Sequence, residues 1–195
     1  MGSELSPKAA EITACARSLI ANRGYNGFSY ADIADAVGIT KASIHHHFPS
    51  KAELVRSVVA AYRAEAAAGL AALAEQVTDP TARLRAWTGF WQACLRERTL
   101  TFCICAMLAT EMPTIPAEVG VEVRGHFDDL SQWLAQLLAE GASAGQFALR
   151  ESATAEALAF MAATHGAMVS ARAYDDAAVF VAISNGLVDR LVVRH

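Results

Sequence analysis

Residues 29–48 read SYADIADAVGITKASIHHHF, and this stretch decides how the N-terminal part of the chain folds. Ser29 and Thr40 are residue types that cap the N-terminus of a helix. Gly38 lies between them and can adopt the positive φ angle of a tight turn, and Ala34 is small enough for two helices to cross closely. Four apolar residues surround this crossing: Ile33, Val37, Ile39 and Ile44. The pattern predicts a helix-turn-helix.

The segments on either side continue the helical pattern. Ser6-Pro7 is typical of the start of a helix, and Gly24 is typical of its end. After the helix-turn-helix, Pro49 breaks the chain, and Ser50 with Glu53 forms a capping box. We therefore expect a first helix before the motif and a long fourth helix after it.

Residues 9–55 closely resemble the N-terminal domain of the TetR family of transcriptional regulators. The resemblance rests on four stretches and two single residues: Arg23-Gly24-Tyr25, residues 28–34 (FSYADIA), residues 37–44 (VGITKASI), residues 47–51 (HFPSK), Glu53 and Leu54. The rest of the chain resembles the family only in the number and order of its helices. His45 and His46 depart from the pattern, because the family often has tyrosine at the first position and tyrosine, tryptophan or arginine at the second.

The resemblance implies a repressor that binds double-stranded operator DNA and is released from it by a small molecule. It also implies a ligand pocket among helices four to eight. Two copies of the last two helices would then form a homodimer interface.

The helix over residues 40–48 is the predicted DNA reader. Its N-terminus presents backbone N–H groups and Lys41, which suit phosphate oxygens, together with small side chains that permit close approach. His45 and His46 follow on the side expected to face DNA, whereas His47 is expected to pack inward. The predicted DNA-contacting residues are Ser29, Tyr30, Thr40, Lys41, Ala42, Ser43, His45, His46 and Lys51.

Three consecutive histidines also suggest a metal site. Successive side chains on a helix diverge by about 100°, however, so three in a row do not converge on one ion. We expect no metal and no cofactor. The chain also shows no Ser/His/Asp order, paired-carboxylate motif or phosphate-binding loop, so we expect no catalytic residue and no enzyme.

The composition favours helices. The chain has 195 residues, of which 54% are hydrophobic and 18% charged, with only five prolines. Apolar stripes with helical spacing continue to the C-terminus. We expect an all-α fold of about nine helices, including a short sixth helix over about residues 102–112. Residues 1–50 would form the DNA-binding domain, and residues 51–195 the ligand-binding and dimerisation domain.

Charge and cysteine content indicate a cytoplasmic protein. The net charge is −4, but all three lysines lie in the first 51 residues. This N-terminal head is therefore less acidic than the rest of the chain and can bind DNA locally. The longest uncharged run, residues 157–171, is too short and too polar to span a bilayer. The four cysteines lack paired spacing, which favours a reducing compartment: Cys15, Cys94, Cys103 and Cys105.

A stripe of bulky residues marks the candidate ligand site. Taken alone, such a stripe is more often core, but methionines recur in the facing segments, and their flexible side chains suit an adaptable pocket for an apolar or aromatic effector. Glu111 and His165 are the nearest candidate polar anchors, although His165 is most simply a core histidine. The predicted ligand-binding residues are Trp87, Trp91, Cys94, Cys103, Met107, Glu111, Phe127, Met161 and His165.

Cys103 and Cys105 leave a second sensing chemistry open. On a helix they diverge by about 200° and so cannot bridge each other without unwinding. Buried, inert cysteine is the default interpretation, and sensing of electrophiles or oxidants by these thiols is the alternative.

The last two helices are rich in small residues, which suit close helix–helix packing. Packing within one chain would explain them, but the resemblance points to a dimer. The predicted interface residues are Ala162, Gly166, Val179, Ile183, Gly186 and Leu187. Together these features favour a ligand-responsive, dimeric transcriptional regulator. The rivals are an enzyme with an accessory helix-turn-helix and a DNA-binding factor that senses no ligand.

Overall fold

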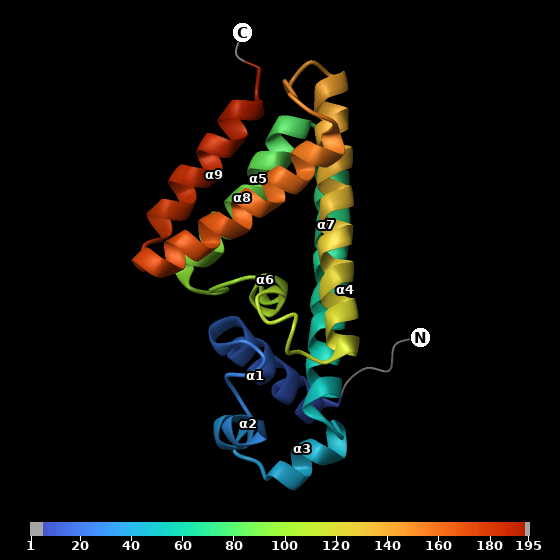
Figure 1. Cartoon of the computed structure of the whole chain (residues 1–195), viewed down its shortest axis with the longest axis vertical. Helices are drawn as coiled ribbons and strands as arrows, with labels where there is room; N and C mark the ends of the chain where they lie inside the picture. The colour runs from blue at the N-terminus through green and yellow to red at the C-terminus, as the bar shows by residue number, and fades with distance from the viewer. Residues whose placement is uncertain (1–5, 194–195) are drawn as a thin grey trace. The chain divides into compact units, whose positions relative to one another are not determined.

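The computed structural model describes residues 6–193. Residues 1–5 of the expected DNA-binding domain and residues 194–195 of the expected ligand-binding domain lie outside this range. The described residues form nine helices and no strand (Figure 1). The helices are α1 (Pro7–Arg23), α2 (Tyr30–Val37), α3 (Lys41–His47), α4 (Lys51–Gln76), α5 (Pro80–Glu97), α6 (Ile104–Ala109), α7 (Ala117–Ser143), α8 (Ala153–Tyr174) and α9 (Ala177–Leu191). The predicted all-α fold is confirmed.

The helix ends follow the capping residues that the sequence contains. Ser6 accepts a hydrogen bond from the backbone of Ala9 at 3.2 Å, and Asp79 accepts one from Ala82 at 2.7 Å. α6 is shorter than expected, because the residues after Ala109 form successive turns instead of a helix. Side-chain caps therefore mark the starts of most of these helices, whereas α6 begins without one.

The described chain divides into two compact units, and α4 and α7 contribute residues to both. The first unit contains residues 6–65 and 102–126, and the second contains residues 66–101 and 127–193. The expected domain boundary after residue 50 thus falls inside the first unit. The start of α4, the whole of α6 and the start of α7 belong with α1–α3.

The first unit has a core of large aliphatic side chains. α1 packs against α2 and α6, and α2 packs against α3. Five fully buried residues come from these helices and from α4: Ile12, Ile20, Ile33, Ile44 and Leu54. By length and composition alone α4 could cross a membrane, but Leu54, Val55 and Val58 lie buried in this core.

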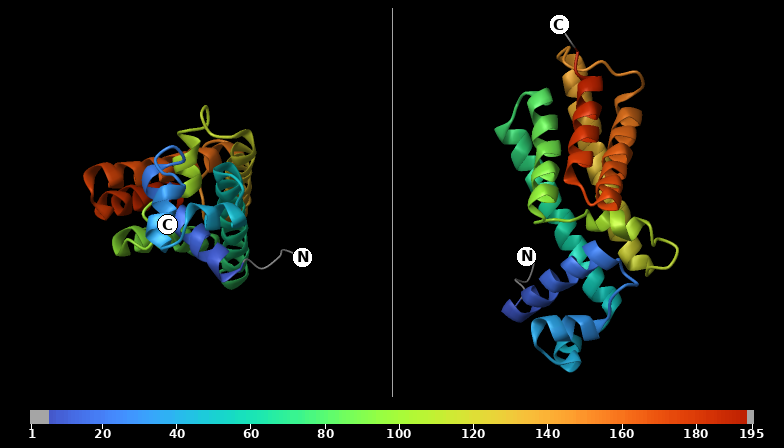
Figure 2. Two further views of the ribbon diagram at one scale, coloured as in Figure 1. Left: turned by 90° about the horizontal axis from the view of Figure 1, so that it is seen from below. Right: turned by 90° about the vertical axis from the view of Figure 1, so that its left-hand side faces the viewer.

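In the second unit, α9 packs against α8 and α5 (Figures 1 and 2). The fully buried side chains include Leu84, Leu134 and Phe180. Arg83 is buried and fixes the turn before α5, because it donates hydrogen bonds to the carbonyl oxygens of Val77 and Thr78 and to Glu140 of α7. This unit therefore combines an apolar core with one well-satisfied buried cation.

Two helical glycines of the second unit give opposite predictions. A Cβ at Gly141 would lie 2.1 Å from the ring of Phe147, whereas a Cβ at Gly69 would meet no atom within 4 Å. Gly141→Ala should therefore lower the free energy of unfolding by about 1–3 kcal/mol through overpacking. Gly69→Ala should raise it by about 0.5–1 kcal/mol through helix propensity. Urea denaturation checks both, and an increase for Gly141→Ala would contradict the close packing of Gly141 against Phe147.

Candidate nucleic-acid interface

The turn between α2 and α3 sets the angle between these two helices. Gly38 has φ +70° and ψ 39°, and its N–H donates to the Ala34 carbonyl at 2.9 Å. Such left-handed backbone favours glycine. Thr40 then caps α3 by accepting a hydrogen bond from the Ser43 N–H at 3.2 Å. The predicted helix-turn-helix geometry is present in the structure.

One face of α3 packs into the core of the first unit, and the opposite face is exposed to solvent. Ile44 is fully buried, and Phe48 at the end of the helix is buried too. His47 is half-buried. The other side chains of α3 are exposed, and these are Lys41, Ala42, Ser43, His45 and His46. An exposed helix face of small and basic residues has the shape and chemistry to enter a DNA groove.

The three histidines point to different partners. The Nδ1 atom of His45 lies 3.2 Å from the Pro49 carbonyl oxygen, and its ring meets the Tyr30 ring edge-on at 4.8 Å. The rings of His46 and His47 contact each other instead, at 5.4 Å. The carbonyl of Pro49 requires a proton on Nδ1 of His45, which leaves its Nε2 for an outside partner.

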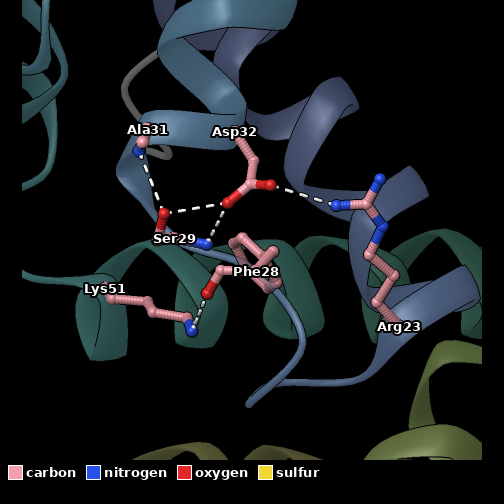
Figure 3. A network of polar contacts seen from close by, with 6 residues as sticks. All are labelled: Arg23, Phe28, Ser29, Ala31, Asp32 and Lys51. Carbon is pink, nitrogen blue, oxygen red and sulfur yellow. Dashed lines mark hydrogen bonds and ion pairs between the residues drawn. The ribbon is translucent and has the colours of Figure 1, made fainter.

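Ser29 and Asp32 form a capping box at the start of α2 (Figure 3). The Asp32 carboxylate accepts hydrogen bonds from the backbone N–H and the hydroxyl of Ser29, both at 2.8 Å, and pairs with Arg23 at 3.0 Å. The hydrogen bonds from Ser29 and the Arg23 charge lower the pKa of Asp32. The Ser29 hydroxyl also accepts a hydrogen bond from the Ala31 N–H at 3.2 Å. Ser29, which the sequence predicted to contact DNA, therefore also caps α2.

Tyr30 holds the helix-turn-helix together from inside. It is buried, and its hydroxyl donates to the carbonyl of Phe48 at 2.9 Å. Burial, with Glu53 and Tyr25 nearby, raises the pKa of Tyr30 to about 12. This placement differs from the expected DNA contact, because the hydroxyl that would reach a phosphate is bound inside the unit.

Lys51 also turns toward the protein. Its ammonium group donates to the Phe28 carbonyl (Figure 3). The same ammonium lies 4.5 Å from the ring centroid of Tyr25 and 4.3 Å from that of Phe28. Partial burial lowers the pKa of Lys51, although Glu111 and Asp32 oppose this shift. The expected phosphate contact would require Lys51 to leave this site. Cation–π contacts explain why it is stable there.

The residues expected to bind an effector are distributed over both units. The second unit holds Trp87, Trp91, Cys94, Phe127, Met161 and His165, and the first holds Cys103, Met107 and Glu111. In the second unit the Trp87 ring contacts those of Trp133 and Phe160 at 6.2 Å and 6.1 Å, and Phe127 contacts His165 at 5.2 Å. Trp133 and Phe160 were not singled out from the sequence, although each continues a helical apolar stripe.

The Glu111 carboxylate forms hydrogen bonds within the first unit. Its carboxylate accepts hydrogen bonds from the backbone of Tyr25 and Asn26 in the loop between α1 and α2. The sequence proposed Glu111 as a polar anchor for a ligand, and the structure uses the same carboxylate for a contact within the first unit. No sequence pattern links residues 86 positions apart, so this contact was missed.

The thiols of the first unit lie in a buried cluster. Tyr62 donates to the sulfur of Cys103 at 3.5 Å, and Nε2 of His126 lies 3.8 Å from the same sulfur. Burial raises the pKa of Cys105 well above its ordinary value, and the neighbouring Cys103 raises it further. All four cysteines are free. A buried thiol with a raised pKa is a poor nucleophile at neutral pH.

One face of α8 and α9 exposes apolar residues. Val169 and Ile183 are 53% and 37% exposed, and Leu158 is half exposed. Ala162 and Gly166 on the same helix are exposed as well. A second polypeptide would bury this face, and the small residues would permit close approach.

Comparison with known proteins gives matches over most of the chain. Residues 12–58 match a family described as bacterial regulatory proteins, tetR family, and residues 80–186 match the tetracyclin repressor-like C-terminal domain. A transcriptional regulator of the TetR family from Agrobacterium tumefaciens, known from its crystal structure, is 50% identical. It superposes with a TM-score of 0.93 over 95% of this chain and 98% of that one.

Two further relatives are more distant. The HTH-type transcriptional repressor KstR2 of Mycolicibacterium smegmatis is 27% identical over 140 residues, which is 70% of this chain and 66% of that protein. The transcriptional regulator AcuR of Cereibacter sphaeroides is 26% identical over 155 residues, or 78% and 71% of the two chains. The chain thus matches about two thirds of the length of these curated relatives.

The capping box of α2 predicts a pH-dependent stability. Because the pKa of Asp32 is lowered in the folded chain, the ionised carboxylate adds stability above its ordinary pKa, and this contribution is lost as the pH falls through the lowered value. Asp32→Asn should therefore lower the melting temperature at pH 7 and lose its effect in acid. Asp35→Asn is the matched control on the exposed side of the same helix. If both variants change the melting temperature equally at every pH, the Asp32 carboxylate does not stabilise the fold through the capping box.

Proposed function

Because the chain belongs to the TetR family of bacterial transcriptional regulators, we propose that it is a dimeric, ligand-responsive repressor that binds a palindromic operator through α3. One observation supports this most directly. The helix-turn-helix presents five exposed small or basic side chains from a helix that a buried Ile44 anchors. A relative named as a repressor supports repression over activation.

DNA binding is proposed to begin at the N-terminus of α3. Its backbone N–H groups and Lys41 would contact phosphates, while Ala42 and Ser43 allow the helix to approach the base edges. His45 would offer Nε2 as a hydrogen-bonding group. Tyr30 and Lys51 would act behind this surface by holding α3 and the preceding loop in place.

A dimer would supply the second recognition helix. A single helix-turn-helix makes few base contacts, and dimers read two half-sites about one helical turn, roughly 34–36 Å, apart. The exposed apolar face of α8 and α9 offers a self-complementary surface for a twofold interface. Its predicted members are Ala162, Gly166, Val179, Ile183, Gly186 and Leu187.

The proposed effector is a small apolar or aromatic compound that binds in the cytoplasm and lowers DNA affinity. The aromatic cluster around Trp87 supports an apolar site, and quenching of tryptophan emission would report occupancy. Such a ligand shifts the protein toward a state with separated recognition helices only if it prefers that state. Sensing of electrophiles or oxidants by Cys103 or Cys105 is the second candidate. Tyr62 and His126 lie beside the Cys103 sulfur, but both thiols are buried, so this route requires the cluster to open to the reagent.

Lys41 tests the DNA surface. Lys41→Ala should weaken binding to a duplex selected from a random-sequence pool by the wild-type protein. It should also flatten the dependence of log affinity on log salt by about one unit for each phosphate that the variant no longer neutralises. Arg150→Ala removes an exposed cation from the second unit and should leave both quantities unchanged. Identical affinities and slopes for the folded Lys41 variant and the wild type would remove α3 as the reader.

Ala162 and Ile183 test the dimer surface. Ala162→Arg and Ile183→Arg would bury an unpaired guanidinium at a close-packed interface, so both variants should be monomeric or aggregated. Ala139→Arg, on an exposed position of α7, makes the same change outside the proposed interface and should remain dimeric. Light scattering measures the mass, and a wild-type dimer mass for both interface variants would refute this placement.

A further inference from the structure

The loop between α1 and α2 is held by a carboxylate from a distant part of the chain. Glu111 lies in the turn between α6 and α7. Its Oε2 accepts the Tyr25 N–H at 2.5 Å, and its Oε1 accepts the Asn26 N–H at 3.1 Å. The side chain of Asn26 adds hydrogen bonds to Glu111 at 3.0 Å and to Thr114 at 3.1 Å. Four hydrogen bonds therefore join this loop to the α6–α7 turn.

The loop is shaped to receive this carboxylate. Gly24 is buried and has φ +73°, and a Cβ there would lie 2.3 Å from Oε2 of Glu111. Only glycine combines this backbone angle with so close an approach. Consecutive N–H groups presented by a turn form a concave site for an anion, and hydrogen bonds to a charged acceptor are stronger than neutral ones.

The α6–α7 turn holds Glu111 firmly on its own side. The Glu111 N–H donates to the Leu108 carbonyl at 3.0 Å, and the Glu111 carbonyl accepts the N–H groups of Thr114 at 2.8 Å and Ile115 at 3.1 Å. Ile115 is buried. A displacement at the end of α6 or the start of α7 must therefore move the carboxylate, or break its hydrogen bonds with the loop.

A cation holds the far end of the same loop. Lys51, the first residue of α4, donates to the Phe28 carbonyl and lies over the rings of Tyr25 and Phe28. Ser29, which follows Phe28 in the chain, caps α2. The orientation of α2, and of the α3 packed on it, thus depends on two charged contacts from segments outside the helix-turn-helix.

We propose that Glu111 is a positioning residue for DNA binding, which ties the loop before the helix-turn-helix to the α6–α7 turn and so sets the orientation of α2 and α3. This inference rests on the proposed function. Glu111 itself touches no DNA. It acts through Tyr25 and Asn26, because a loop freed from the carboxylate lets α2 and α3 sample orientations that do not fit the groove.

The test uses the full chain and the duplex selected by the wild-type protein. Glu111→Ala should weaken binding about tenfold or more, whereas the salt slope should stay unchanged, since the same number of phosphates is neutralised. Glu111→Gln should recover part of the affinity, because its amide oxygen can still accept from the loop. Glu75→Gln removes an exposed carboxylate from the second unit and should bind like the wild type.

Hydrogen exchange separates positioning from a general loss of structure. In Glu111→Ala the amides of Tyr25 and Asn26 should exchange at least tenfold faster, while those of Ile20 and Ile44 keep their protection. Wild-type affinity for Glu111→Ala would overturn the proposal. So would loss of protection throughout the first unit in both the Ala and the Gln variants. If the wild-type protein itself selects no duplex, the proposed function fails, and the inference fails with it.

Discussion

The left-handed turn at Gly38 is the constraint on which the rest of the head depends. It directs the chain from α2 into α3 so that Ile44 enters the core and the opposite face of α3 stays outside. A residue with a Cβ would strain this left-handed backbone. The capping box of Ser29 and the hydrogen bond from Tyr30 to the Phe48 carbonyl then fix both ends of the motif.

The polar contacts around α2 and α3 bear on the proposed function. Groove recognition places several side chains at once, so a small tilt of α3 would misalign all of them together. Polar side chains fix the position of α2. Asp32 caps this helix, and Lys51 of α4 and Glu111 of the α6–α7 turn bind the loop before it. Those same contacts reach α4 and the α6–α7 turn. A protein that must release DNA on a signal benefits from a head whose geometry depends on helices outside it.

Local patterns in the sequence predicted the fold well, because caps, turns and apolar stripes act over a few residues. Ser6, Asp79 and Ser152 mark helix starts in the chain as they do in the structure. The site was predicted only in part. The sequence predicted Lys51 and Tyr30 as DNA contacts. In the structure they donate to the carbonyl oxygens of Phe28 and Phe48, and the positions of these carbonyls depend on the tertiary fold, which a local pattern does not encode. The contact from Glu111 to Tyr25 joins distant segments, and no periodicity encodes it. The extent of α6 was overestimated, because its apolar pattern continues into turns.

Regulation by this protein depends on whether the exposed face of α3 reads DNA. Amide chemical-shift mapping of the isotope-labelled protein with its selected duplex answers that question residue by residue. The largest changes should fall on Lys41, Ser43, His45 and His46, with only small changes in α5 and α9. If these four amides keep their free positions while another surface shifts on saturation with DNA, α3 is not the reader.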